Sequence, residues 1–257
     1  MIIDKDFWLN LHLREDKSSE ITCPACGKGK INISEHLMIF ETEKSKKYTK
    51  YVSCFGGFID KRFSGFLICN NDECNEIVAV CGSVNAEQSK HNDTEYINQD
   101  YIECLLPEYF SPPLNIFPLK QIYPSAVNKL LEKSFSLFFM DNESCGNKIR
   151  ISVEVLLDEL GVRKEKDCKH KTYRLNLNDR IREYQSINMY IGELMLSIKW
   201  IGNYGSHNDS ISKSDLLDGY EMMCTILDNL YDNQTDKLLK LSRTINIHER
   251  PASKITN

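Results

Sequence analysis

The first third of the chain alternates short apolar runs with turn-forming residues, which is the pattern of a small β-rich module. Four segments have the length and the β-branched and aromatic content of strands, namely INISEHLMIF (31–40), YTKYVSCF (48–55), SGFLIC (64–69) and EIVAVCG (76–82). Residues 83–100 are polar and weakly patterned, and residues 105–124 contain five prolines, which disfavour helix. We therefore predict a β module over residues 1–82 and a linker with a proline-rich connector over 83–124.

After Pro124 the apolar residues recur every three or four positions, which is the period of helices packed through one face. The spacing predicts helices over about 125–139 and 144–160, with Gly161 ending the second, and a polar basic connection over 162–174. We expect an all-α domain over residues 125–232 and a polar tail over 233–257.

Within this helical half, Asn178 is the expected N-cap of a third helix. The next helix is predicted from a continuous apolar stripe made of Ile187, Ile191, Leu194, Ile198 and Ile201. The last long helix begins at Ser212, because Ser212 and Asp215 have the spacing of a capping box.

Composition is that of an ordinary globular protein, with 257 residues, 27% of them charged and 41% hydrophobic. The formal net charge of −5 excludes a global basic field that would attract nucleic acid. No apolar run approaches the ~20 residues of a membrane span, and the N-terminus lacks a signal pattern, so we expect a cytoplasmic protein with no membrane partner. In that compartment the ten cysteines are reduced thiols or metal ligands.

Four of these cysteines have the spacing of metal ligands. Cys23 and Cys26 form a Cys-x2-Cys turn, and Cys69 and Cys74 form a Cys-x4-Cys turn. Two such turns, brought together by hairpins, supply the four thiolates that structural Zn²⁺ prefers, and a four-thiolate site leaves no open position for metal catalysis. Cys54 or Cys81 is an alternative ligand, a redox dithiol is an alternative role, and the isolated cysteines are expected in the core, at positions 104, 145, 168 and 224.

A polar run, Lys199 to His207, closes the fourth predicted helix. Asn203 and His207 are one helical turn apart, so an amide and an imidazole share one face. Buried polar groups need hydrogen-bond partners, so the pair is either a satisfied structural pair or a ligand site.

The helix Asn147 to Gly161, the run Lys199 to His207 and the helix after Ser212 resemble a HEPN-type helical domain, similar to the family called domain of unknown function 4145. An N-terminal zinc ribbon precedes that domain in many such proteins, and the resemblance covers about residues 20–82 and 120–232. It implies an α+β chain in which a small β zinc-ribbon module is followed by an all-α HEPN-like helical bundle.

The resemblance also implies chemistry. HEPN ribonucleases cleave RNA without metal, through Arg-x4–6-His motifs that meet across a dimer, with the ribose 2′-hydroxyl as nucleophile. Here Gly202 stands where the motif arginine is expected. In the catalytic interpretation His207 transfers the proton, Asn203 positions the scissile phosphate, and Arg150 or Lys199 supplies positive charge.

These residues support three hypotheses of different class. The first is an RNA-directed, metal-independent endoribonuclease of a bacterial defence or toxin system, such as antiviral defence. The second is a non-catalytic zinc-binding module that dimerises or binds a partner protein, with Asn203 and His207 structural. The third is a sensor of a nucleotide or phosphate ligand.

Two basic clusters are candidates for RNA contact, because cations beside aromatics suit phosphates and unpaired bases. The first contains Lys44, Lys46, Lys47 and Lys50 with Tyr48 and Tyr51, on an expected hairpin; the second contains Arg163, Lys164, Lys166, Lys169, His170, Lys171 and Arg174. A homodimer is expected, with Ile201, Tyr204 and Tyr231 as apolar surface.

Overall fold

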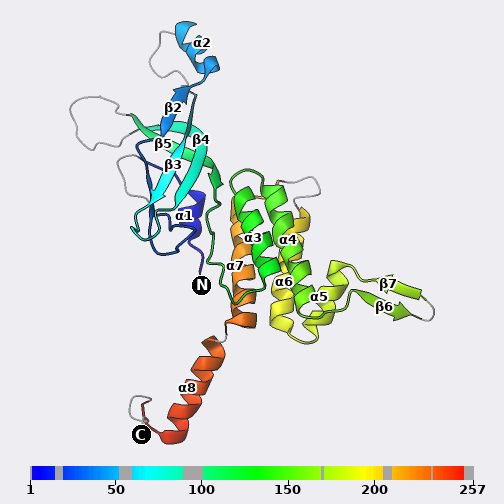
Figure 1. Ribbon diagram of the computed structural model, residues 1–257. Helices are drawn as coiled ribbons and strands as arrows, with labels where there is room; N and C mark the ends of the chain where they lie inside the picture. Colours follow the sequence, from blue (N-terminus) through cyan, green and yellow to red (C-terminus); the bar gives the residue numbers. More distant parts are fainter. Residues whose placement is uncertain are drawn as a thin grey trace.

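The computed structural model describes residues 2–14, 20–51, 60–88, 101–168, 171–204, 210–232 and 234–251. It is a mixed α+β structure, with an antiparallel sheet in the N-terminal half and helices after it (Figure 1). The described elements of the N-terminal half are α1 (Lys5–Leu9), β1 (Ile31–Ile33), β2 (Met38–Glu41), α2 (Glu43–Tyr51), β3 (Lys61–Cys69), β4 (Ile77–Gln88) and β5 (Tyr101–Ser111).

The sheet has the strand order β1-β3-β4-β5, and β2 pairs with β3 beyond β1, so that β1 and β2 lie along the same edge of β3. Alternation along β3 separates the two faces, since Phe63, Leu67 and Cys69 are buried whereas Phe66 and Ile68 are exposed. The buried face belongs to the same apolar cluster as Ile21 before β1, and Phe110 of β5 contacts Phe139 after α3, with ring centroids 5.1 Å apart.

The strand predictions over 64–69 and 76–82 are confirmed by β3 and β4. The predicted strand over 31–40 is two strands with a turn between them. The prediction over 48–55 is wrong for residues 48–51, which belong to α2; Thr and Tyr favour strands, but helix formation prevails here, with an ion pair between Glu43 and Lys46 (2.8 Å).

The predicted linker over 83–124 is wrong for residues 83–88 and 101–111, which pair as the second half of β4 and as β5. The β module therefore continues to Ser111 rather than ending at residue 82. Pro107 made the segment resemble a connector. It lies in the edge strand β5, opposite Gly82 at a register shift, where the sheet loses little stability from a missing N–H.

The helical half contains α3 (Ser125–Leu137), α4 (Asn142–Glu159), the hairpin strands β6 (Glu165–Cys168) and β7 (Lys171–Arg174), α5 (Leu177–Gln185), α6 (Met189–Tyr204), α7 (Lys213–Tyr231) and α8 (Gln234–His248). The predicted helices and the capping box of Ser212 and Asp215 are confirmed. Gly161 follows α4 with a φ of +71° and ends it as predicted.

Three details of the helical half differ from prediction. The N-cap of α5 is Asn176 rather than Asn178, and Ile187 precedes α6 and is exposed, so the buried stripe begins at Ile191. The basic connection over 162–174 contains a hairpin, and the polar tail contains α8. Neither element is buried, so neither has the apolar pattern from which a strand or a helix is predicted.

One hydrophobic core runs through both halves. Trp8 of α1 packs edge-on against Phe138 after α3, with ring centroids 6.2 Å apart. In the connector over 112–124, Phe117 is buried against Phe135, with centroids 5.4 Å apart. The connector is therefore packed into the core between the two halves and is not a solvent-exposed linker. None of the helices that the structure describes is long and apolar enough to span a bilayer.

Candidate functional site

The four predicted metal ligands lie together. The Sγ atoms of Cys23, Cys26, Cys69 and Cys74 are all within 4.8 Å of one another. The Cys23–Cys74 and Cys26–Cys69 Sγ distances are 3.9 and 3.8 Å. A tetrahedron of thiolates at the usual Zn–S distance has edges of about 3.8 Å, so the cluster has the size of a closed four-thiolate site. These Sγ–Sγ distances are too long for a disulfide, in which the two sulfur atoms are about 2.0 Å apart.

Backbone N–H groups stabilise negative charge on this cysteine cluster (Cys23, Cys26, Cys69 and Cys74). The N–H of Gly29 donates to Cys26 Sγ at 3.3 Å; this bond is the largest of several, including one from the backbone of Lys28, that together lower the pKa of Cys26 to about 6. The N–H of Asn71 acts in the same direction on Cys69, but burial and the adjacent thiols outweigh it and raise the pKa of Cys69 to about 12. The backbone donors therefore favour a thiolate at Cys26, and the thiolate is the form of cysteine that binds a metal ion.

The two cysteine turns leave no room for a side chain at position 29. A Cβ on Gly29 would lie 2.5 Å from Cys69 Sγ, so close approach of the two turns requires glycine there. Of the alternative ligands, Cys81 is exposed on β4 away from the cluster, and Cys54 lies outside the described residues. Cys104, Cys145 and Cys224 are buried elsewhere, as expected of core cysteines.

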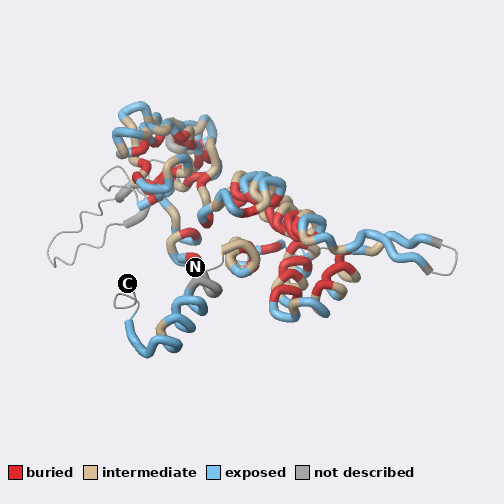
Figure 2. The backbone as a smooth tube through the Cα atoms, turned by 60° about the horizontal axis from the view of Figure 1, so that its bottom comes forward, coloured by how far each residue is buried: buried red, intermediate tan, exposed pale blue. Residues whose placement is uncertain are grey.

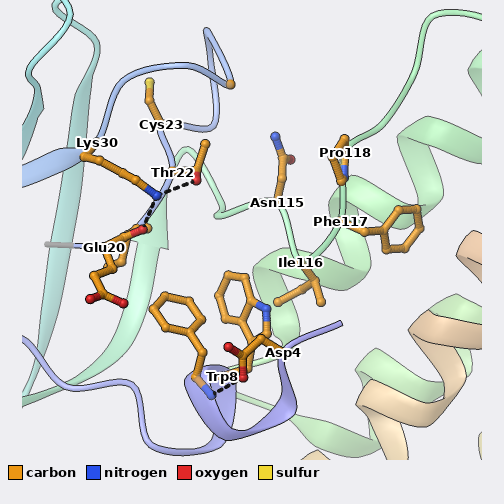
Figure 3. Close-up of a pocket in the computed structure, with 13 residues that line it drawn as sticks. Asp4, Trp8, Glu20, Thr22, Cys23, Lys30, Asn115, Ile116, Phe117 and Pro118 are labelled. Atoms are coloured by element: carbon orange, nitrogen blue, oxygen red, sulfur yellow. Dashed lines mark hydrogen bonds between the residues drawn. The ribbon is translucent and has the colours of Figure 1, made fainter. Parts of the chain in front are cut away.

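An apolar pocket of about 620 Å³ lies beside the cysteine cluster (Figure 3). It is enclosed by α1, the first cysteine turn and the connector, and Trp8, Ile116 and Phe117 are among its apolar walls. At its rim the Lys30 amine donates to the Glu20 carbonyl and to Thr22 Oγ1 at 2.6 and 3.1 Å. The pocket could not be predicted from the sequence, because the connector from Asn115 to Pro118 meets α1 and the first cysteine turn only in the folded chain.

A second pocket, of about 610 Å³, lies in the helical half and brings together three of the four predicted catalytic residues: Arg150 from α4 and Lys199 and Asn203 from α6. We call it the basic pocket. Its cations outnumber its carboxylates by five to two, the cations being Arg150, Lys164, Arg174, Arg180 and Lys199 and the carboxylates Glu154 and Asp158. The amides of Asn176, Asn178 and Asn203 add neutral donors.

The two carboxylates are occupied by their own ion pairs. Glu154 accepts from Arg150 at 3.0 Å, and Asp158 binds Arg180 at 2.7 Å and Lys164 at 2.8 Å. Partial burial opposes ionisation of Asp158, but the two cations outweigh it and lower its pKa. The pocket therefore keeps an excess of positive charge.

Lys199 is a buried cation of this pocket that has no carboxylate partner among the described residues. It is 8% exposed, its amine donates to Asn178 Oδ1 at 3.0 Å, and it lies 3.5 Å from the ring centroid of Trp200. Burial, with a smaller contribution from Arg182, lowers its pKa. Within the described part of the chain, neither Lys199 nor Arg174 makes an ion pair with a carboxylate, so a bound anion would be their first full negative partner.

Gly202 occupies the position where the resemblance to HEPN ribonucleases would place an arginine. The atoms around it show why this position requires glycine. A Cβ there would lie 2.6 Å from Arg150 Cβ and 2.8 Å from the Gly146 carbonyl oxygen. An arginine at 202 cannot fit, because α4 and α6 touch at this point. The side chain of Arg150 starts at that same contact and lines the basic pocket from α4.

His207 and residues 205–209 lie outside the described residues, so the pairing of Asn203 with His207 stays a prediction. The cluster around Lys44 and Lys46 is on helix α2, not on a hairpin as predicted. The second basic cluster is on the β6–β7 hairpin and contributes Lys164 and Arg174 to the basic pocket. Lys169 and His170 are also outside the described residues.

Sequence reasoning missed Arg180 and Asn178 as pocket residues. Arg180 is only 6% exposed, and its guanidinium also donates to the carbonyl of Val162 at 3.0 Å. A cation in the buried stripe of the amphipathic α5, next to Ile181, was the available signal, since charges are rarely buried without partners.

Two known families match the chain, one on each side of the connector over 112–124. Residues 11–110 match a family described as Domain of unknown function (DUF8608), and residues 132–249 match Domain of unknown function (DUF4145). No curated protein and no solved structure gives a significant match. The second match runs from within α3 to just past the end of α8, and therefore includes every residue of the basic pocket.

Proposed function

We propose that the helical half is a HEPN-like domain that binds RNA at the basic pocket and cleaves it without a metal ion. The observation that carries the proposal is the gathering of Arg150, Lys199 and Asn203 at one pocket with an excess of positive charge. A phosphodiester would supply the negative charge that Lys199 lacks. An apolar ligand would gain nothing from these cations.

In this mechanism the chain's own residues do three things. The Arg150 guanidinium, held by Asn147 and Glu154 on its own helix, stabilises charge that builds on the phosphate. The Asn203 amide orients that phosphate. His207, three residues past the described end of α6, takes the proton of the 2′-hydroxyl as the 2′-oxygen bonds to phosphorus, an exchange suited to an imidazole. The bond from phosphorus to the 5′-oxygen breaks, and the 5′-oxygen leaves with a proton from water, so the products are a 2′,3′-cyclic phosphate and a 5′-hydroxyl.

For the N-terminal half we propose a structural Zn²⁺ in the cysteine cluster, in the manner of a zinc ribbon. The thiolate edges of 3.8 and 3.9 Å and the N–H bonds to Cys26 and Cys69 support it. We further propose a cytoplasmic homodimer that acts in bacterial defence or as a toxin, with the β module recognising RNA or a partner protein.

A second candidate function is a non-catalytic dimerisation or partner-binding module. It is favoured by the absence of an arginine at position 202, which removes the motif's own cation. In that case the basic pocket binds an anionic partner and the RNA is not cut.

The test is RNA cleavage by the wild type, His207→Ala, Arg150→Ala and Lys148→Ala, with total RNA and tRNA, in the presence of EDTA. Lys148→Ala is the matched control, since it removes one positive charge from α4 outside the pocket. We expect wild type and Lys148→Ala to leave 2′,3′-cyclic phosphate ends. We expect the other two to lose at least about 100-fold in rate.

Circular dichroism of the EDTA-treated proteins checks that each remains folded during the assay. If folded wild type leaves RNA intact, catalysis is excluded and the binding module replaces it. If Arg150→Ala cleaves as fast as Lys148→Ala, the basic pocket is not the site of the reaction.

A further inference from the structure

The β6–β7 hairpin is an arm that stands out from the helical bundle (Figures 1 and 2). Its strands pair with each other and pack little against any other element. Every one of its residues whose burial is described is exposed. Hairpins of this size are barely stable alone in water, and this arm adds nothing to the core, so its surface chemistry is the feature to explain.

The arm has two chemically different faces. Lys166 is paired with Tyr173, and Lys164 with Leu175 through the Leu175 N–H, so Lys164, Lys166 and Tyr173 lie on one face. The other face carries the pairs Glu165–Arg174 and Asp167–Thr172. One face is therefore basic with an aromatic ring that is 55% exposed, and the other contains both acids.

The basic face continues into the basic pocket. Lys164 lies at the base of the arm and also lines the pocket, where its amine contacts Asp158 at 2.8 Å. Arg174, the last residue of β7, also lines the pocket, but its strand position places it with Glu165 and Asp167 on the other face of the arm. Positive charge thus runs from Lys199 at the pocket, past Lys164, to Lys166 on the arm.

We propose that this face of the arm holds single-stranded RNA as the strand leaves the basic pocket, with Lys166 at a phosphate and Tyr173 stacked on an unpaired base. The inference rests on the proposed function, because the strand must first enter the pocket. A strand of four residues spans about 14 Å, which lengthens the contact beyond the pocket itself. The acidic face restricts the strand to one side.

A single strand fits these features better than a duplex or a protein does. Stacking on Tyr173 requires a base that is not paired. An acidic protein segment would meet Lys166 but would leave the exposed ring without a matching planar partner.

The experiment is fluorescence anisotropy with a labelled 2′-O-methyl RNA 12-mer, which lacks the attacking hydroxyl, at several salt concentrations. A dinucleotide that fits only the pocket is measured by competition. Tyr173→Ala and Lys166→Ala test the arm, and Arg150→Ala tests the pocket. Tyr190→Ala and Lys133→Ala are matched controls, since both residues are exposed on helices outside the pocket lining.

We expect Tyr173→Ala to weaken 12-mer binding by about 5- to 100-fold with an unchanged salt slope. Lys166→Ala should reduce the slope of log K against log salt by about 0.7, the value for one phosphate contact on a single strand. Both arm variants should bind the dinucleotide as wild type does, whereas Arg150→Ala should weaken both ligands.

The outcomes separate the two proposals. Loss of 12-mer binding in Arg150→Ala with full binding by both arm variants overturns the arm's role and leaves the proposed function standing. A duplex bound as tightly as the single strand and unaffected by Tyr173→Ala also overturns it. Failure of wild type to bind any RNA overturns both proposals together.

Discussion

The cysteine cluster and the basic pocket differ in how the chain builds them. All four thiols come from two turns of one small sheet, and each turn supplies two of them within six residues. The pocket takes one or two cations from each of α4, α5, α6 and the hairpin, over residues 150–203. A site coded by local spacing can be read along the chain, whereas a site coded by helix packing is defined only in three dimensions.

The two sites also differ in what holds them. The cysteine cluster depends on the thiolates and the N–H groups that face them, with Gly29 allowing the turns to approach. The basic pocket depends on the contact between α4 and α6 at Gly202. The comparison therefore predicts that ligand removal damages the first site and overpacking damages the second.

The largest effect is expected from removing a thiolate. Cys26→Ser should release the metal and cost the β module about 4–5 kcal/mol or more, because metal binding and folding are coupled in such sites. Cys81→Ser, on an exposed cysteine, is the control and should do neither. Zinc content measures the release of the metal, and thermal melting measures the loss of stability. A Cys26→Ser protein that keeps its zinc and its melting point contradicts the proposed ligand set.

A smaller effect is expected from overpacking the α4–α6 contact. Gly202→Ala puts a methyl group against Arg150 and the Gly146 carbonyl and should lower the free energy of unfolding by about 1–3 kcal/mol. Gly219→Ala is the matched control on α7, where the nearest atoms are 3.8 Å away, and it should raise stability by up to about 1 kcal/mol.

Denaturant unfolding measures both glycine variants. Equal effects of the two substitutions would show that α4 and α6 are not in close contact at Gly202. The assignment of Arg150 as the replacement cation would then lose its structural basis.

The smallest effect concerns the charge of Lys199. Its pKa is lowered by burial and by Arg182, so its proton is lost at a lower pH than that of an ordinary lysine. Anion binding should therefore weaken as pH rises through this lowered value, below the ordinary pKa of 10.5. Lys199→Arg keeps its charge over this range and should bind RNA with less pH dependence. Anisotropy of the RNA 12-mer between pH 7 and about 10 measures this difference.

Identical pH profiles for wild type and Lys199→Arg would remove Lys199 from the anion site. A melting curve at each pH is the control for loss of structure.

Helix ends and strand interiors could be predicted from the sequence wherever they depend on residues that are neighbours along the chain. The Ser212–Asp215 capping box, the stop at Gly161 and the strand over 64–69 depend on neighbours in sequence. Strand β5 was missed, because an edge strand tolerates Pro107 only with its partner β4 in place. The hairpin over 165–174 was missed because neither of its faces is apolar.

The α+β division, the grouping of the four cysteines and the helical faces could be predicted from the chain, since these depend on residue type at spacings of a few positions. The set of cations that share a pocket, and the reason for a glycine at position 202, became visible only in the folded chain. The reason is physical: side chains from α4, α5 and α6 meet through packing between helices, and the positions at which helices touch are not encoded in the period of any one of them.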